Sequence, residues 1–349
     1  MCIRDRYWDL GAFFARSSVR DSSFYGYSKA QIIYEAINDD YRSGRMLINM
    51  ASQQEAVKDY MGSEANIILA IERFKPLKQN KFLYESYNRL GIVAKGLGEY
   101  DKAIGYYKEA LIYYNKLEHN KHYLPRMTNN IGVVYKKKKD FSNAIKNFER
   151  VLVADSIKFI NPKLYATALN NLAFSKIKIS DTLGIKAIIN KSMHIKDSLG
   201  LYTSLTTSYI TLAEYYLFKK DTTASILTIN KAKEIAKEST NNMRMLEILA
   251  FLNKIDYKNA SLHGQAYIEL SERLETEERR ARNKFARIRF ETDEFIAENE
   301  VLSEEKEILF EEKELLSKQN QIWAALAAGF FLFGLAIYII VDQRSKNQK

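Results

Sequence analysis

The sequence predicts an all-α protein in which six or seven helical hairpins of about 40 residues stack as an α-solenoid, followed by a long helix and one transmembrane helix. Glycine and proline are scarce, with 14 Gly and 3 Pro in 349 residues, whereas average usage gives roughly 24 and 17. One pattern recurs along most of the chain. The composition, 46% hydrophobic and 28% charged, is that of a globular protein.

The clearest repeats are residues 88–111 and 129–152, which align position by position. In each, a small residue in the first helix allows the second helix to cross closely, since a bulky side chain would hold the backbones apart. In the second helix, Ala103 and Tyr107 share one face. The small residue follows Leu, Ile or Met in every unit and stands at Gly11, Ala51, Gly91, Gly132, Ala173, Ala213 and Ala250. No unit can bury its apolar stripe alone, so neighbouring units must stack.

This pattern resembles the tetratricopeptide repeat (TPR). Two units fill its signature closely, with Ala94 in place of Tyr as the one departure in the first of them. The matching residues are Tyr87, Leu90, Gly91, Ala94, Ala103, Tyr107 and Ala110, then Thr128, Ile131, Gly132, Tyr135, Ala144, Phe148 and Val151. The resemblance implies a TPR-like solenoid over residues 4–258, with helices longer than in the 34-residue form.

The first residues carry little information. The first repeat begins near Arg4, and we expect residues 1–3 to be a head foreign to the natural protein. No apolar segment of the kind found in signal peptides follows them. The only cysteine, Cys2, excludes an internal disulfide and a CxxC metal cluster.

Residues 259–320 predict a long charged helix, basic in 279–289 and acidic in 298–314. Apolar residues recur every seven positions, which gives a heptad seam with polar residues in the other core column. The apolar column is Phe295, Leu302, Leu309, Leu316 and Trp323, and the polar column is Asn299, Lys306, Lys313 and Asn320. Two interpretations remain open: a single solvated helix, or a parallel homodimeric coiled coil through residues 295–323.

Residues 322–341 contain no charged residue, and their length matches a hydrocarbon core about 30 Å thick, which predicts a transmembrane helix. Trp323 and Tyr338 lie near its ends, and Ala325 and Gly329 offer a contact for helix pairing. Residues 342–349 form a basic tail. The positive-inside rule therefore predicts a single-pass membrane protein with its C-terminus inside and its repeats outside. In a Gram-negative bacterium this would be an inner-membrane protein with a cytoplasmic C-terminus and periplasmic repeats.

This order of parts resembles a group of bacterial membrane signalling proteins, in which a histidine kinase or a LuxR-type DNA-binding domain follows the membrane span. The resemblance implies that this chain is the extracytoplasmic sensor region, and we expect the natural protein to continue into an output domain. The alternative is a constitutive, tail-anchored assembly scaffold with no signalling role. A reporter fused to either end would separate the two.

No catalytic constellation is predicted, and we expect no enzyme activity, cofactor or metal site in this chain. The four histidines are scattered, and His119 and His122 have no third ligand near them in sequence. The net charge of +10 invites a nucleic-acid interpretation. Residues 269–318 are net acidic, however, so the positive charge is spread over the repeats and no nucleic-acid partner is expected.

Three asparagines, Asn88, Asn129 and Asn170, occupy the same repeat position, three before the small residue. The resemblance implies that this position faces the concave groove of the array. An Asn side chain both donates and accepts hydrogen bonds, so a ladder of them can pair with an extended peptide backbone. The alternative is that they bridge neighbouring helices, an interpretation that fits Asn130 and Asn171 better.

Lysines and one aromatic residue complete the candidate site. Lys95 and Lys136 lie four residues after the small residue and would attract a carboxylate or an acidic side chain. Phe174 would make part of the groove apolar. The predicted partner is a peptide or protein ligand in this groove.

Overall fold

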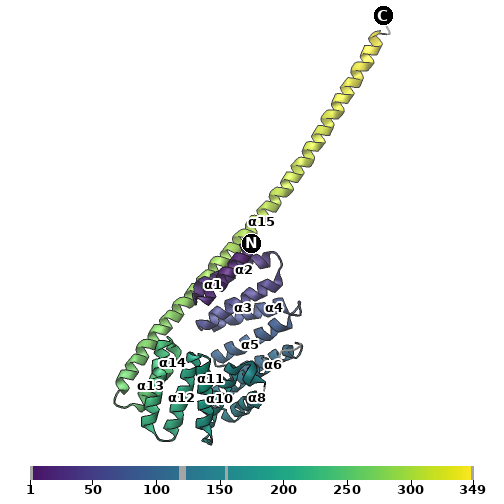
Figure 1. The fold of residues 1–349 in the computed structure, drawn as a ribbon. Coiled ribbons are helices and arrows are strands. Elements are labelled where there is room, and N and C mark those ends of the chain that lie inside the picture. The colour runs from purple at the N-terminus through teal and green to yellow at the C-terminus, as the bar shows by residue number, and fades with distance from the viewer. Residues whose placement is uncertain (1–2, 118–122, 154–155, 347–349) are drawn as a thin grey trace. The chain divides into compact units, whose positions relative to one another are not determined.

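A computed structural model describes residues 3–117, 123–153 and 156–346 (Figure 1), and all regular elements in these ranges are α-helices. The all-α prediction is therefore confirmed. In chain order the helices are α1 (Ile3–Arg16), α2 (Arg20–Ala36), α3 (Asp40–Ala56), α4 (Tyr60–Phe74), α5 (Asn80–Gly96), α6 (Tyr100–Tyr114), α7 (Tyr123–Lys137), α8 (Phe141–Val153), α9 (Ile157–Ile160), α10 (Pro162–Lys178), α11 (Ile185–Ser198), α12 (Tyr202–Phe218), α13 (Thr222–Glu238), α14 (Asn242–Ile255) and α15 (Ala260–Lys346).

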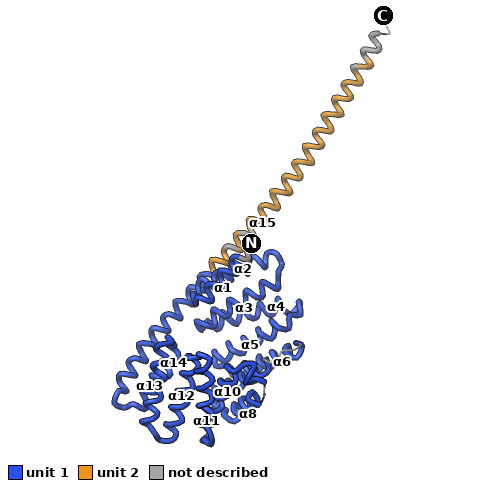
Figure 2. Tube along the Cα trace, in the orientation of Figure 1, with its two compact units in different colours: residues 1–288 blue, residues 289–349 orange. Residues whose placement is uncertain are grey.

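The chain forms two compact units, residues 1–288 and residues 289–349 (Figure 2). The first unit holds α1–α14 together with the beginning of α15, and the second holds the remainder of α15. The first unit extends past residue 258, where the repeats end in the sequence. The reason is that residues 278–288 of α15 pack against the first repeats.

Consecutive helices of the first unit pair as six hairpins: α1/α2, α3/α4, α5/α6, α7/α8, α10/α11 and α12/α13. The first helix of a seventh unit, α14, then precedes α15, and the short α9 lies in the connection between the fourth and fifth hairpins. Each hairpin also contacts the next along the chain. The predicted solenoid of six or seven units is confirmed.

The small residue of each first helix lies where its partner helix crosses. A Cβ atom added to Gly91 would lie 2.3 Å from Cε1 of Tyr107, and one added to Gly132 would lie 2.7 Å from Cε1 of Phe148. Both distances are far below van der Waals contact, so these glycines provide space for an aromatic ring of the second helix. They do not make turns.

The turns use few glycines because a single left-handed residue ends most of the helices. Non-glycine residues with positive φ include Asn38, Lys58, Lys139 and Lys220. An acidic or amide residue follows each of them and often caps the next helix: Asp59 Oδ1, for example, accepts the backbone N–H of Gly62 at 3.1 Å. This turn chemistry explains how a long helical array is built with so little glycine.

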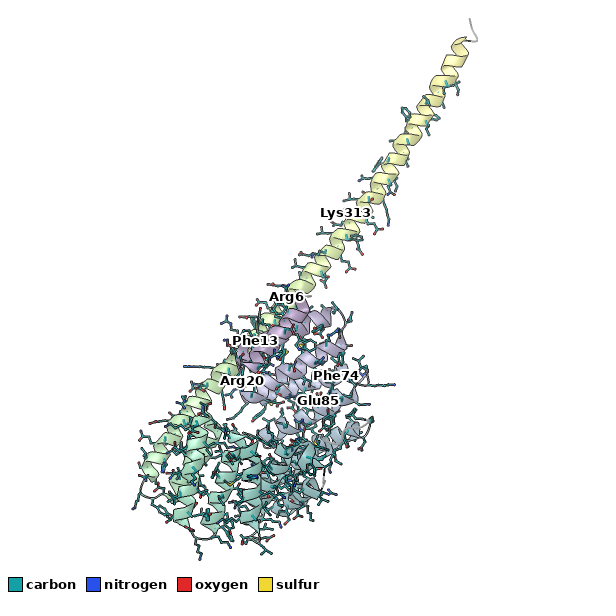
Figure 3. All side chains as sticks on the ribbon, in the orientation of Figure 1. Arg6, Phe13, Arg20, Phe74, Glu85 and Lys313 are labelled. Carbon is teal, nitrogen blue, oxygen red and sulfur yellow. The ribbon has the colours of Figure 1, made fainter. Side chains whose placement is uncertain are left out.

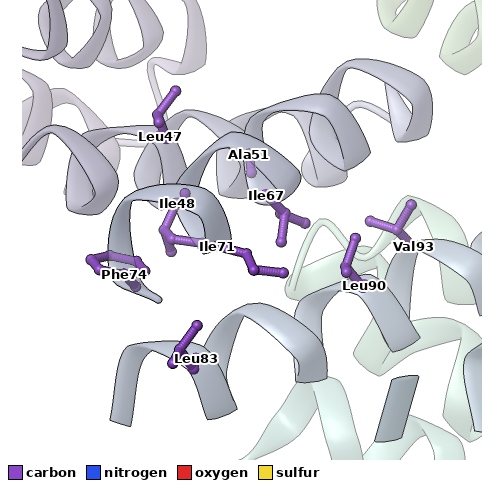
Figure 4. Close-up of a cluster of buried hydrophobic side chains, with 10 residues drawn as sticks. Leu47, Ile48, Ala51, Ile67, Ile71, Phe74, Leu83, Leu90 and Val93 are labelled. Atoms are coloured by element: carbon purple, nitrogen blue, oxygen red, sulfur yellow. The ribbon is translucent and has the colours of Figure 1, made fainter. Parts of the chain in front are cut away.

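A separate hydrophobic core fills each junction between hairpins, as Figure 4 shows for α3, α4 and α5. Ile67 and Phe74 of α4 are fully buried there, and Leu83 and Leu90 of α5 cover them from the next repeat. Because each core is shared by neighbouring hairpins, no repeat is stable alone.

Residues 278–288 of α15 pack against the first two repeats, at the end of the array opposite α14 (Figure 1). Phe285 is fully buried and stacks on Phe24 of α2, with ring centroids 4.5 Å apart. Lys58 and Glu278 form an ion pair of 2.7 Å, and Nη1 of Arg282 donates to the carbonyl of Val57 at 3.3 Å. The sequence had indicated only a charged helix here.

The second unit is the later part of α15. All side chains from 301 to 337 are exposed, including Lys313 and the heptad residues Leu302, Leu309, Leu316 and Trp323 (Figure 3). Among the described residues, α15 is the one helix that contains a stretch long and apolar enough to cross a membrane. The side chains of Phe295, Asn299 and Tyr338, the histidines His119 and His122, the first two residues and the side chains of the basic tail lie outside the described residues.

Candidate functional site

The six predicted residues lie on the first helices of three consecutive repeats, and we call them the ladder face. Asn88 and Lys95 belong to α5, Asn129 and Lys136 to α7, and Asn170 and Phe174 to α10. All three asparagines are buried, whereas the lysines and Phe174 are half-buried. The asparagine amides therefore lie inside the array, whereas the two lysines and Phe174 keep part of their surface exposed.

Asn88 bridges two repeats. Its Oδ1 accepts a hydrogen bond of 3.0 Å from Nδ2 of Asn130 in α7. Asn171 has a similar role, since its Oδ1 accepts from Nζ of Lys136 at 2.6 Å. The bridging role predicted for Asn130 and Asn171 is thus confirmed, and Asn88 shares it.

Asn129 and Asn170 differ from Asn88. They are 7% and 3% exposed, and no donor within the described ranges bonds to the Oδ1 atom of either one. A buried amide oxygen without a donor costs about 1–3 kcal/mol. These two asparagines are therefore the members of the ladder whose hydrogen-bonding capacity the fold leaves unused.

Lys136 and Phe174 are brought together across α7 and α10. The ammonium of Lys136 lies 5.2 Å from the ring centroid of Phe174, within range of a cation–π contact. Burial, and in smaller measure the positive charges of Lys137 and Arg244, lower the pKa of Lys136 to about 8. Because Arg244 lies on α14, the seventh repeat acts electrostatically on the fourth.

Lys95 lies on α5, one repeat before Lys136. Its pKa is lowered first by burial and then by the charge of Lys137, while Glu55 acts in the opposite direction. Its charge in turn lowers the pKa of Lys136. Lys95 and Lys136 thus lie close enough to share one electrostatic field.

The structure adds Lys196 of α11, which the sequence analysis missed. Lys196 is 2% exposed, and its Nζ donates to Oγ of Ser208 at 2.7 Å. Burial lowers its pKa to about 7, followed by the charges of Arg244 and Lys136. A lysine inside an apolar repeat core is a weak sequence signal, because its neighbours in space come from other repeats.

We call Lys95, Lys136, Lys196 and Arg244 the cationic cluster. Four elements, α5, α7, α11 and α14, contribute one residue each. Two carboxylates act on it: Glu247, which pairs with Arg244 at 2.6 Å and raises the pKa of Lys136, and Glu55, which raises the pKa of Lys95. Two carboxylates against four cations leave the cluster electropositive.

Charges on either side of the ladder face are paired between repeats. Arg89 contacts Glu55 at 2.9 Å, which joins α5 to α3. Lys178 contacts Glu214 at 2.5 Å, which joins α10 to α12. Each of these ion pairs therefore joins the first helices of adjacent repeats.

Comparison with known proteins supports the repeat assignment. Residues 82–156 match the tetratricopeptide repeat family model, and no curated protein matches the chain. The chain contains TPR units in this region, and its first unit is a TPR-like solenoid. Folds of this type are typical of interaction modules.

Solved structures share the fold at low sequence identity. The apo form of RapI superposes with a TM-score of 0.65 and 15% identity, over 81% of this chain and 100% of that one. A Rap protein complexed with competence and sporulation factor gives 0.62 and 14%, over 78% and 75%. The apo quorum sensor NprR from B. thuringiensis gives 0.63 and 14%, over 76% and 75%.

Proposed function

We propose that this chain is a membrane-anchored receptor module whose ladder face binds an extended peptide carrying an acidic group. The observation that carries the proposal is the placement of two unused amide oxygens, on Asn129 and Asn170, beside an electropositive cluster. Solved structures with this fold include a Rap regulator in complex with the Phr* peptide. That likeness supports a peptide as the ligand.

Main-chain recognition would use the asparagines. An extended peptide presents N–H and C=O groups at a regular spacing, and an Asn amide can pair with both without reading side chains. Asn129 and Asn170 stand at the same position of adjacent repeats, so they would contact successive parts of one peptide. A modest side-chain rotation would bring their amides out of the core.

Electrostatic recognition would use the cationic cluster. A carboxylate placed near Lys136 would offset the repulsion from Lys137, Arg244 and Lys95 that now lowers its pKa. Charge complementarity of this kind raises the association rate and excludes basic peptides. The ligand we propose therefore has an acidic side chain or a free C-terminal carboxylate.

Membrane anchoring would use the exposed apolar run at 322–341. The described large side chains of this run, among them Phe330, Phe331 and Phe333, are exposed. A soluble surface rarely exposes so much contiguous apolar area, so a lipid bilayer is the natural environment for it. We further propose that the repeats lie outside the inner membrane and relay ligand binding towards a cytoplasmic output.

Binding can be tested with a synthetic library of random heptapeptides with free C-termini, applied to the full chain in detergent. We expect enrichment of acidic peptides by the wild type and a loss of at least about tenfold in affinity, or about 1.4 kcal/mol, in Asn129→Ala/Asn170→Ala. A matched control is Asn190→Ala/Asn230→Ala, which removes two exposed amides on the second helices α11 and α13.

Unchanged binding by the Asn129→Ala/Asn170→Ala variant would overturn the groove assignment. A charge control is Lys136→Met compared with Lys231→Met, because Lys231 is exposed on α13. We expect the first change alone to abolish the preference for acidic peptides. Topology is tested separately by reporters fused before residue 4 and after residue 349. A cytoplasmic N-terminus would favour a constitutive scaffold over a sensor.

A further inference from the structure

The beginning of α15 is held at two places within the first unit. At its base, Oδ2 of Asp256 lies 3.1 Å from Nε2 of His263 and accepts from Nδ2 of Asn259 at 2.9 Å. His263 is buried, and its ring and the side chain of Asn259 tie the first turn of α15 to the end of α14. The base is therefore a compact hydrogen-bonded corner.

The second attachment is residues 278–288, which we call the latch. Phe285 inserts into a cluster from the first two repeats and stacks on Phe24 with an interplanar angle of 19°. Ala281 and Ile288 lie beside it on the same helix face, as the spacings of four and three residues require. The other buried residues of the cluster are Tyr27, Ala30, Tyr34, Met46, Met50 and Val57.

Polar contacts surround this apolar centre. The ion pair of Lys58 and Glu278 has side chains 40% and 21% exposed, and Lys284 pairs with Asp21, whose pKa it lowers. Exposed pairs of this kind contribute only about 0–1 kcal/mol each. The latch thus depends mainly on the apolar contacts of Phe285, Ala281 and Ile288, whereas each repeat junction buries a whole layer of residues.

A stiff element connects the two attachments. His263 and Phe285 are 22 positions apart in α15 (285 − 263), and no Gly or Pro stands between residues 265 and 285. This length of helix spans about 33 Å. In a repeat array each unit otherwise contacts its neighbours alone, so the separation of the two ends depends on small rotations summed over all the repeats.

We propose that the latch is releasable, and that its docking sets the curvature of the repeat array. While it is docked, α15 holds the first two repeats at a constant separation from α14, and the ladder face between them keeps one geometry. When it is released, the rotations between repeats relax and the ends separate. A receptor module needs two such states, with different curvature, in order to signal that its ligand has bound.

The test measures the separation of the ends directly. In the full chain with Cys2→Ser, spin labels at Ala65→Cys of α4 and Leu227→Cys of α13 occupy exposed positions of the second and sixth repeats. Pulsed electron–electron double resonance then gives the distance distribution between the two spin labels. We expect Phe285→Ala to widen this distribution and lengthen its mean, and amide exchange of 278–288 to rise on the order of tenfold.

The matched control is Phe159→Ala, since Phe159 is 80% exposed on α9 and its loss should leave the distribution as in the wild type. A second route reverses one charge: Glu278→Lys should widen the distribution, and adding Lys58→Glu should restore it. Rapid exchange at 278–288 with an unchanged distribution would overturn the proposal, as would failure of the double charge reversal to restore it. Should Phe285→Ala not fold, the charge series decides.

Discussion

The ammonium of Lys196 donates to the hydroxyl of Ser208 at 2.7 Å in the core between α11 and α12. No carboxylate within the described residues forms an ion pair with it, and Ser208 in turn lies 3.2 Å from the hydroxyl of Ser192. Two neutral hydroxyls compensate a buried charge poorly. This pair therefore links the stability of the array to pH.

We predict that the array becomes more stable as pH rises above neutrality. Burial lowers the pKa of Lys196 from 10.5 to about 7, so between these values the unfolded chain binds more protons than the folded one, and stability increases with pH. The gain from pH 7 to pH 9 is about 2 kcal/mol for this lysine. Urea unfolding at several pH values measures it, and Lys196→Met should remove this component.

The ladder asparagines should differ in their structural contribution. Asn88→Leu should destabilise the array by about 1 kcal/mol, because it leaves the amide of Asn130 without its acceptor. Asn129→Leu and Asn170→Leu should be neutral or stabilising, since each removes a buried oxygen that has no donor within the described part of the chain. Equal losses in all three would show that the ladder is purely structural.

Two glycines should respond to alanine in opposite directions. Gly91→Ala forces a Cβ into the ring of Tyr107 and should cost about 1–3 kcal/mol. Gly105→Ala meets no atom within 4 Å on the exposed side of α6 and should stabilise by about 0.5–1 kcal/mol. Thermal unfolding of the two variants gives the comparison, and a destabilised Gly105→Ala would contradict it.

If residues 295–323 pair as a parallel coiled coil, the heptad predicts which cysteines cross-link. Leu309 occupies a core position, whereas Glu311 lies two residues later on the outer surface. In membranes, Leu309→Cys should form a disulfide-linked dimer and Glu311→Cys should not. Equal cross-linking of both would favour a single solvated helix with random collisions.

Much of the fold could be predicted because its information is local. The repeat step, the small residue at Gly91 and the aromatic at Tyr107 lie within one hairpin, and the structure places them in contact. For residues this close in sequence, the pattern of apolar and small residues predicts which side chains pack together.

The long-range features were not predictable in this way. Phe285 resembles any apolar residue of a charged helix, and its partner Phe24 lies in the first repeat. In the cationic cluster, Arg244 comes close enough to Lys136 to lower its pKa because the array is curved. This curvature is the sum of small rotations between repeats, and the sequence of one repeat does not reveal it. The ladder positions were identified by register, but the hydrogen bond that distinguishes Asn88 from Asn129 and Asn170 is visible only in three dimensions.

The stacking of Phe24 on Phe285 also has a consequence for synthesis. Phe24 is made 261 residues before its partner (285 − 24), which at about 5–20 residues per second is a delay of about 13–50 s. During that interval the apolar surface around Phe24 has no cover from its own chain. The nascent protein is therefore most prone to aggregation at its first repeats, and a chaperone that recognises exposed aromatic surface would be expected to act there.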